Sequence, residues 1–235
     1  MKDNITLDNA IIKVRDLTKT YYSGQVVTPV LKGIDLDIAP GEFVAIMGKS
    51  GAGKSTLLYQ ISLLDRPTSG TIDIDGVNIL GIDESERTSF RLNELGYVFQ
   101  DYALVPELSA QENVAIPMLM QGQDTASAYQ QAQKVLDSIG MSDKYHNRPN
   151  QLSGGEQQRV SIARGVGQNP KILFADEPTA NLDSASSQAV IEVLRDLHQK
   201  GQTIVMVTHE PEYTGYCDRI VYLEDGVITN YDHKV

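Results

Sequence analysis

The chain has 235 residues, of which 41% are hydrophobic and 22% are charged, and its formal net charge is −11. These proportions are those of a globular protein and exclude the disordered and collagen-like classes. The length fits one large α/β domain, or one domain with a small inserted lobe. A surface this acidic repels phosphate backbones, which argues against nucleic acid as the main partner and against docking on anionic lipid by charge alone.

Hydrophobic run lengths and the cysteine count bear on localisation. No run approaches the roughly 18–20 apolar residues that a membrane-spanning helix needs, and residues 1–4 lack the apolar core of a secretory leader. Cys217 is the only cysteine, which excludes an internal disulfide and a cysteine-based zinc site and fits a reducing cytoplasm. We therefore expect a cytoplasmic protein without direct membrane insertion, which only a partner would hold at a membrane.

The first part of the chain predicts mainly strands. Asp75-Gly76 is typical of a hairpin turn, because both turn positions favour positive φ. The expected strands, recognised by apolar alternation or by a short apolar run, are 11–17, 30–38, 43–47, 71–74 and 77–79.

From Gly96 the pattern becomes helical. Ser109 and Glu112 form a capping box that opens a helix, which Pro117 is expected to break near its middle. Further helices are expected over 125–139 and 184–200, and further strands over 171–175, 203–207 and 219–224. Strands that alternate with helices predict a mostly parallel sheet covered on both faces, with an all-helical stretch over about 102–168 inserted into it.

A phosphate-binding loop follows the apolar run 43–47. The motif G-x-x-x-x-G-K-[ST] is complete and leads into a helical pattern over 56–64. Its glycines let successive backbone N–H groups converge on phosphate oxygens, and the helix N-terminus adds its dipole. We expect Lys54 to reach the β- and γ-phosphates of ATP and the Ser55 hydroxyl to ligate Mg²⁺. The predicted nucleotide-binding residues are Gly48, Lys49, Ser50, Gly51, Ala52, Gly53, Lys54, Ser55 and Thr56. The alternative, a glycine-rich turn with a solvated lysine, requires a chance match to the whole motif.

Two adjacent carboxylates end the apolar strand predicted over 171–175. Strand C-termini of a parallel sheet converge on the phosphate loop, so we expect Asp176 to hold Mg²⁺ through water and Glu177 to orient and deprotonate the attacking water. The carboxylates could instead cap the next helix or solvate a turn. A glutamate rather than a glutamine at position 177 predicts a hydrolase.

The segment L-S-G-G-E-Q-Q-R, residues 152–159, resembles the signature motif of ABC ATPases, which other P-loop NTPases lack. The motif order also matches over nearly the whole chain: phosphate loop, Gln100, signature, Asp176-Glu177, Asn181-Leu182-Asp183, His209. The resemblance implies an α/β fold of the P-loop NTPase class, with a mostly parallel core sheet flanked by helices, an antiparallel β subdomain and an inserted helical lobe. It implies a single domain over 1–235, with the core at 1–100 and 169–235 and the lobe at about 101–168.

The signature has a physical logic of its own. Ser153 caps a helix behind Gly154-Gly155, which would make a second anion site from exposed N–H groups and a positive helix end. The resemblance implies that Ser153, Gly154, Gly155 and Glu156 bind the γ-phosphate held by a second copy of the chain, so that two ATP molecules lie within a homodimer. The alternative, a capped helix without a ligand, accounts for the capping box but not for the glycine pair.

Other roles follow from the resemblance by position. Gln100 is expected to sense Mg²⁺ and the attacking water, and Asp183 to lie in the segment that crosses the dimer interface. His209 is expected to contact the γ-phosphate and to position Glu177.

Tyr21 matches the aromatic residue that stacks on adenine. Tyr22 is a neighbouring competitor for that role, and Tyr21 could instead be a core aromatic.

Softer features indicate a branch of the family. The segments L-D-R-P-T-S-G at 64–70 and E-N-V-A-I-P at 112–117 resemble ATPases that pair with macrolide-exporter, lipoprotein-release and cell-division membrane subunits, as does Glu156. This implies an integral-membrane permease partner at the cytoplasmic face of the membrane, on which ATP-driven closure does mechanical work. A regulatory scaffold controlled by ATP uses the same motifs and stays open as an alternative. The chain lacks the long coiled coil of the DNA-repair ABC ATPases and the tandem cassettes of the ribosome-associated type.

Gly165 departs from the family pattern, which often has alanine there, and is expected to cost the signature helix about 1 kcal/mol of stability. Lys49 is also unusual, but it occupies a free position of its motif.

Overall fold

The computed structural model describes residues 9–233. Among these, one compact unit contains the residues up to Thr88 together with those from Gly201 onward, and a second contains Ser89–Lys200. The N-terminal residues 1–4, on which the prediction of a missing secretory leader rests, lie outside the described part. Over residues 9–233, none of the helices is both long enough and apolar enough to cross a bilayer. The helical lobe at about 101–168 stays a prediction.

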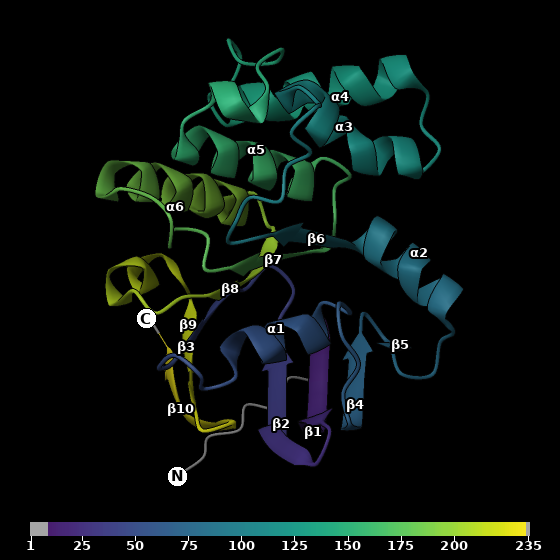
Figure 1. Cartoon of the computed structure of the whole chain (residues 1–235), viewed down its shortest axis with the longest axis vertical. Helices are drawn as coiled ribbons and strands as arrows, with labels where there is room; N and C mark the ends of the chain where they lie inside the picture. The colour runs from purple at the N-terminus through teal and green to yellow at the C-terminus, as the bar shows by residue number, and fades with distance from the viewer. Residues whose placement is uncertain (1–8, 234–235) are drawn as a thin grey trace. The chain divides into compact units, whose positions relative to one another are not determined.

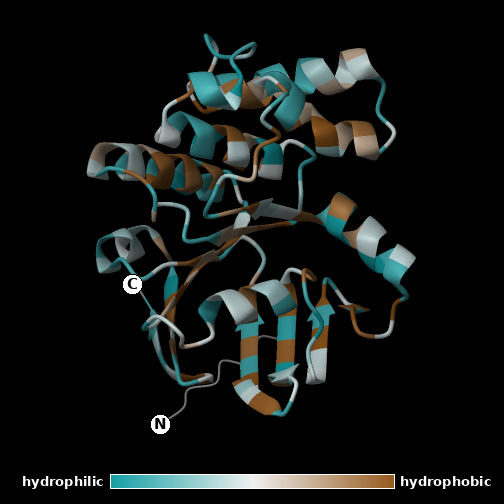
Figure 2. Ribbon diagram, viewed as in Figure 1, coloured by the Kyte–Doolittle hydropathy of each residue, from teal (hydrophilic) through white to brown (hydrophobic). Residues whose placement is uncertain are grey.

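An antiparallel sheet forms one part of the first unit. Its strands follow the order β2-β1-β4-β5 (Figure 1). Their bounds are β1 Ile12–Ser23, β2 Val26–Ile38, β4 Ser69–Ile74 and β5 Val77–Asn78. Hydrophobic and hydrophilic residues alternate along β1 and β2 (Figure 2), as the burial of their inner side chains requires. Both strands run further than predicted, because the outer end of their hairpin is exposed on both faces and carries no alternation.

The second sheet of this unit supports the phosphate loop. Its strands follow the order β10-β9-β3-β8, with β3 parallel to β8 and β9, and β10 antiparallel to β9. Their bounds are β3 Phe43–Met47, β8 Thr203–Val207, β9 Arg219–Glu224 and β10 Val227–His233. Every residue of β3 and β8 is buried, which explains their continuous apolar sequences. Sequence patterns missed β10 because most of its side chains are partly or fully exposed.

Two helical segments accompany these strands. Helix α1, Lys54–Ile61, follows β3 across the phosphate loop, and a 3₁₀ helix, η2, spans Pro211–Tyr216. Helix α2, Glu84–Glu94, begins in this unit and ends in the second. It was not predicted, because its mostly polar sequence buries only the Arg87 side chain and shows no apolar face.

The second unit combines two parallel strands with four helices. Strands β6, Leu95–Val98, and β7, Ile172–Asp176, pair in parallel. The helices are α3 Ala110–Met120, α4 Thr125–Ser138, α5 Gly154–Val166 and α6 Ser184–Gln199, and a 3₁₀ helix, η1, spans Pro149–Gln151. Helix α5 lies against α3, α4, α6 and β6 (Figure 1). The core between the helices includes Val114, Met118, Ala132, Leu136, Leu152 and Val160.

Two expectations for this region are wrong. The segment from Gly96 is not helical at once, since Leu95–Val98 forms β6, a strand too short to show a clear period. Helix α3 also continues through Pro117 to Met120. An interior proline costs a helix about 3 kcal/mol, but Val114, Ala115 and Met118 of α3 are fully buried, so their packing outweighs that cost.

A close approach of two backbones explains the glycine in the signature helix. A Cβ atom on Gly96 of β6 would lie 2.0 Å from the Gly165 carbonyl oxygen of α5. A Cβ atom on Gly165 would lie 3.1 Å from Leu173 Cδ1 and 3.3 Å from the Tyr97 carbonyl oxygen. The tight packing of α5 on β6 therefore offsets the cost in helix stability of having glycine at position 165.

Replacing Gly96 by alanine tests this packing. The new methyl group has to push α5 away from β6, so Gly96→Ala should lower the free energy of unfolding by about 2 kcal/mol or more. The matched control is Gly81→Ala, because a Cβ there would lie no closer than 3.5 Å to its nearest neighbour, the Asn78 carbonyl oxygen. Urea denaturation of both variants makes the comparison, and equal midpoints would contradict the close approach.

Candidate functional site

The phosphate loop is packed so tightly that two of its glycines cannot carry a side chain. Gly53, the N-cap of α1, has φ +101, in the left-handed region, and a Cβ there would lie 3.1 Å from Leu31 Cδ2 of β2. A Cβ on Gly48 would lie 2.1 Å from the Leu223 carbonyl oxygen of β9. The loop backbone is therefore fixed between β2 and β9 before any ligand arrives.

The turn between β9 and β10 supports the loop. The Gly226 N–H donates to the Ala52 carbonyl at 3.1 Å, and the Gly226 carbonyl accepts from the Lys32 N–H of β2 at 2.9 Å. A Cβ on Gly226 would lie 2.1 Å from the Val30 carbonyl oxygen. Sequence analysis missed this support, although Asp225-Gly226 carries the same hairpin signal as Asp75-Gly76.

Two lysines of the loop have different environments. Lys54 is 6% exposed, and its ammonium donates to the Lys49 carbonyl at 3.2 Å, so its charge lies over the loop. The Lys49 side chain is 88% exposed, with its ammonium 4.0 Å from Glu224 Oε1. An exposed pair at that separation contributes little to stability, so Lys49 is free to move toward an anion.

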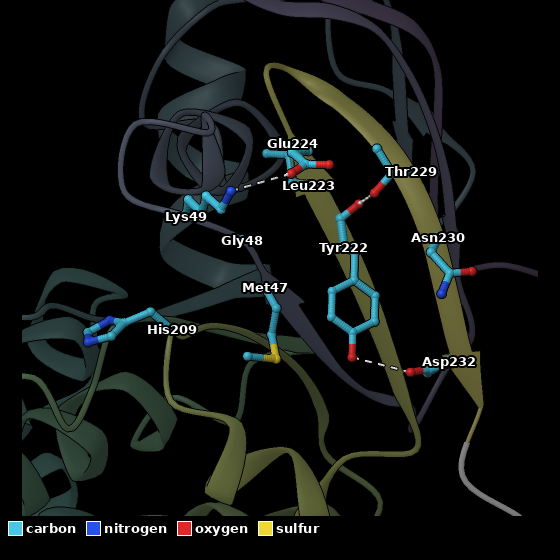
Figure 3. A pocket seen from close by; sticks show the side chains of 10 residues that line it. All are labelled: Met47, Gly48, Lys49, His209, Tyr222, Leu223, Glu224, Thr229, Asn230 and Asp232. Atoms are coloured by element: carbon cyan, nitrogen blue, oxygen red, sulfur yellow. Dashed lines mark hydrogen bonds and ion pairs between the residues drawn. The ribbon is translucent and has the colours of Figure 1, made fainter.

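His209 shares a cavity with this loop. The Thr208 N–H donates to the Ile46 carbonyl of β3 at 3.2 Å, and the Thr208 hydroxyl accepts from the Glu210 N–H at 3.1 Å, which fixes the chain on both sides of His209. Figure 3 shows the side chains that line this cavity, which has a volume of about 570 Å³. It is lined by Met47, Gly48, Lys49, His209, Tyr222, Leu223, Glu224, Thr229, Asn230 and Asp232. The predicted γ-phosphate sensor and the phosphate loop therefore lie at one cavity.

The structure separates Tyr21 from its competitor Tyr22. Tyr21 pairs with Thr28 and Tyr22 with Val27, so the two side chains point to opposite faces of the hairpin. The Tyr21 hydroxyl donates to Asp65 Oδ2 at 3.0 Å, and it also interacts with the Thr56 side chain of α1. Tyr22 is 70% exposed and Tyr21 is 42% exposed, so neither is a core aromatic. Of the two, Tyr21 faces the helix that follows the phosphate loop.

Asp65 holds its negative charge strongly. Burial alone would raise the pKa of its carboxyl, but hydrogen bonds from Lys19, Gln60, the Arg66 N–H and Tyr21 outweigh burial and lower the pKa to about 2. Its ion pair with Lys19 measures 2.8 Å. This group was not singled out from the sequence, because its partners are scattered over β1, α1 and the loop that follows α1.

The two predicted carboxylates of the second unit lie at the end of β7. Asp176 is its last residue and is 5% exposed, while Glu177 is half-buried. Glu177 has φ +43, and its carbonyl accepts from the Ala180 N–H at 3.2 Å. A left-handed conformation costs a residue other than glycine roughly 1–2 kcal/mol, and such strain is typical of functional positions.

The loop that carries Gln100 is tied to other predicted motifs of the same unit. The Gln100 carbonyl accepts from Asn181 Nδ2 at 3.0 Å. Arg164 of the signature helix donates to the Tyr102 and Ala103 carbonyls at 3.0 and 2.5 Å, and both of these residues have positive φ. Sequence analysis missed Arg164, because nothing in a single sequence distinguishes it from a solvated helix residue. Hydrogen bonds therefore join the signature helix directly to the Gln100 loop.

The signature opens α5 with the predicted capping box. The Ser153 N–H donates to Glu156 Oε2 at 2.8 Å, and the Glu156 N–H donates to Ser153 Oγ at 3.3 Å, as expected. The hydrogen bond from the Ser153 backbone is the main reason that the pKa of Glu156 is lowered, and the Ser153 hydroxyl and Lys144 add to it against the effect of burial.

The glycine pair of the signature has a packing reason that the sequence did not show. A Cβ on Gly154 would lie 2.9 Å from the Tyr102 hydroxyl, and one on Gly155 would lie 2.8 Å from Ser186 Cβ. The Tyr102 hydroxyl is the far end of a side chain and can move aside, whereas Ser186 Cβ is held by its backbone. Gly155 is therefore needed with or without a ligand, and its presence does not by itself indicate an anion site.

Asp183 is the N-cap of α6. Its two carboxylate oxygens accept from the Ser186 N–H at 3.0 Å and from the Ser186 hydroxyl at 2.8 Å. The Ser186 backbone bond is the main cause of the lowered pKa of Asp183. Asp183 therefore shapes the turn from Asn181 to α6, whatever else this segment contacts.

Known proteins resemble this chain in sequence. Residues 31–180 match the family described as ABC transporter. An uncharacterized ABC transporter ATP-binding protein of Methanocaldococcus jannaschii is 46% identical over 224 residues, which cover 95% of this chain and all of that protein. The macrolide export ATP-binding/permease protein MacB of Marinobacter nauticus is 44% identical over 216 residues, 92% of this chain but 34% of that protein. The chain thus spans about a third of the MacB relative.

A solved structure is similar as well. The ATP-binding cassette MJ0796, in a dimeric post-hydrolysis state bound to ADP and Pi, superposes with a TM-score of 0.88 at 39% identity. The match covers 94% of this chain and 98% of that one.

The pH dependence of stability follows from Asp65. Because its pKa in the folded protein, about 2, lies below the ordinary value of 3.8, the ionised carboxylate stabilises the fold above pH 4, and this contribution is lost as the pH falls from about 4 toward 2. Asp65→Asn should therefore lower the free energy of unfolding by roughly 1 kcal/mol at pH 7, allowing for solvent screening. Urea denaturation at several pH values measures the difference, which should shrink below pH 4. A difference that grows on acidification would refute the assignment.

Proposed function

The chain belongs to the ABC transporter family of ATPases, and from this premise we propose that its ATP-driven dimerisation powers an integral-membrane partner. The observation that carries the proposal is the phosphate loop, held between β2, β9 and the Gly226 turn with the Lys54 charge over it. A loop fixed in this way binds a triphosphate without having to be ordered first.

The loop and Tyr21 have the proposed roles in nucleotide binding. The N–H groups of residues 48–53 and the start of α1 receive the phosphates, and Lys54 neutralises them. Tyr21 stacks on adenine. The oxygen donors Ser55, Asp176 and Gln100 are of the kind that Mg²⁺ prefers, so this donor set fits the ion. When bound, Mg²⁺ neutralises charge on the phosphate oxygens.

We propose roles in hydrolysis for Glu177, Gln100 and His209. Glu177 accepts a proton from the water that attacks the γ-phosphate, and Gln100 orients that water. His209 contacts the γ-phosphate and positions Glu177. The half-buried position of Glu177, directly after the buried Asp176 at the end of β7, supports its assignment as the base.

The signature has a proposed role in dimerisation. We infer that Ser153, Gly154, Gly155 and Glu156 of one copy bind the γ-phosphate held by the other, and that Asp183 orders the turn at their interface. The support is that the similar cassette MJ0796 is dimeric. Each copy has a net charge of −11 and repels the other, so closure depends on the phosphate bridge. Hydrolysis removes that bridge and reopens the dimer.

The membrane partner is proposed from the relatives. MacB is named as an ATP-binding and permease protein, and this chain resembles one third of it. We propose that the chain acts on a permease subunit at the cytoplasmic face of the membrane, and that the tie between Arg164 and the Gln100 loop passes the motion on.

Neutralising Glu177 tests the catalytic assignment. Glu177→Gln keeps the size of the side chain but removes the base, so steady-state ATP turnover should fall by at least about 100-fold while the affinity for Mg-ATP changes little. Glu192→Gln is the matched control, since Glu192 is an exposed carboxylate on α6. Phosphate release measures turnover, and near-normal turnover by Glu177→Gln would refute the assignment.

A further inference from the structure

Three side chains, those of Lys19, Tyr21 and Gln60, meet at the carboxylate of Asp65. We call Lys19, Tyr21, Gln60 and Asp65 the Asp65 cluster. Asp65 Oδ2 accepts hydrogen bonds from the Tyr21 hydroxyl at 3.0 Å and from Gln60 Nε2 at 3.0 Å, and it pairs with the Lys19 ammonium at 2.8 Å. Asp65 Oδ1 accepts from the Arg66 N–H at 2.7 Å. Both carboxylate oxygens are therefore engaged.

The cluster joins two parts of the proposed nucleotide site. Tyr21 lies in β1, whereas Gln60 lies in α1, the helix whose first residue is Lys54. A single atom, Asp65 Oδ2, holds both side chains. The position of the Tyr21 ring is therefore fixed relative to the helix that begins at the phosphate loop.

Lys19 covers one face of the Tyr21 ring. Its ammonium lies 4.8 Å from the ring centroid, within the range of a cation–π interaction. It also donates to the Arg66 carbonyl at 2.5 Å, and its side chain is 11% exposed. Since Tyr21 is still 42% exposed, the ring keeps an accessible surface on which a planar base can stack.

Hydrogen bonds from Arg87 fix the backbone at Asp65. Arg87 is 5% exposed and donates to the Leu63 and Asp65 carbonyls at 2.9 and 2.5 Å. Leu63 has φ +61, so the chain turns sharply between α1 and Asp65. Asp65 consequently presents its carboxylate from a rigid support and not from a mobile loop.

We propose that Asp65 is a positioning residue that presets the Tyr21 ring for stacking on the base of ATP, with Lys19 as the support beneath the ring. The inference rests on the proposed function, because Tyr21 has to be the adenine platform. A tyrosine held in one rotamer loses less entropy on binding than a free one. The carboxylate should therefore improve ATP affinity by about 3- to 10-fold and leave affinity for a ligand without a base unchanged.

The experiment compares two ligands on five proteins and one control variant. Isothermal titration calorimetry measures the Kd for Mg-ATP and for Mg-tripolyphosphate, which has no base. The proteins are the wild type, Asp65→Asn, Tyr21→Phe, Tyr21→Ala, and Tyr21→Ala combined with Asp65→Asn. Glu84→Gln is the control, because it removes a neighbouring carboxylate and its ion pairs with Arg66 at 2.8 Å and with Arg87 at 4.0 Å. It leaves the four contacts of the Asp65 carboxylate described above in place.

We expect Asp65→Asn and Tyr21→Phe each to bind ATP about 3- to 10-fold more weakly, with tripolyphosphate affinity within twofold of wild type. Asp65→Asn should cause no further loss of ATP affinity in the Tyr21→Ala background, and Glu84→Gln should match wild type. Tyr21→Phe removes a single hydroxyl, which bonds Asp65 and also interacts with Thr56, so it tests whether the ring is held in place even if Asp65→Asn fails to fold.

Three results would overturn the inference while leaving the proposed function intact. They are an equal loss for both ligands, wild-type ATP affinity in Asp65→Asn and Tyr21→Phe, and an undiminished effect of Asp65→Asn in the Tyr21→Ala background. A wild-type protein that binds neither ligand would overturn the proposed function and this inference with it.

Discussion

Close backbone packing around the phosphate loop is the constraint on which the other features of the first unit depend. Gly48 has no room for a side chain against β9, and Gly226 fits between the Val30 carbonyl and the Ala52 carbonyl. Because β2, β9 and the turn at Gly226 all hold the loop, its N–H groups are oriented before a nucleotide binds. A fixed loop then gives the Lys54 charge and the His209 cavity defined positions relative to it.

In the second unit, hydrogen bonds and close packing connect the predicted motifs to one another. Arg164 and Asn181 hold the carbonyls of the Gln100 loop, while Ser186 both packs on Gly155 and bonds Asp183. Networks of hydrogen bonds and packed side chains can carry energetic coupling between sites. We infer that a ligand at the signature acts on α5, α6 and the Gln100 loop together.

Much of the secondary structure could be predicted from the sequence alone, and the elements that were missed have physical reasons for it. Strands 43–47, 203–207 and 219–224 were predicted with their observed bounds, because full burial makes them continuous apolar runs. Both capping boxes were also predicted, since a cap depends on side chains three residues apart. Edge strand β10, short strand β6 and polar helix α2 have no strong period and were missed. The tolerance of Pro117 and the requirement for Gly165 depend on tertiary packing, which no local pattern contains.

The central claim is that ATP joins two copies, each gripping one nucleotide through Lys54 and a second through the turn at Ser153. The most direct test is the molar mass of Glu177→Gln, which should bind ATP without hydrolysing it, measured by light scattering with and without saturating Mg-ATP. The account predicts about twice the monomer mass with Mg-ATP, and loss of that dimer when Ser153 is also replaced by a bulky charged residue. A protein that binds Mg-ATP yet stays at the monomer mass of 25.8 kDa would contradict it.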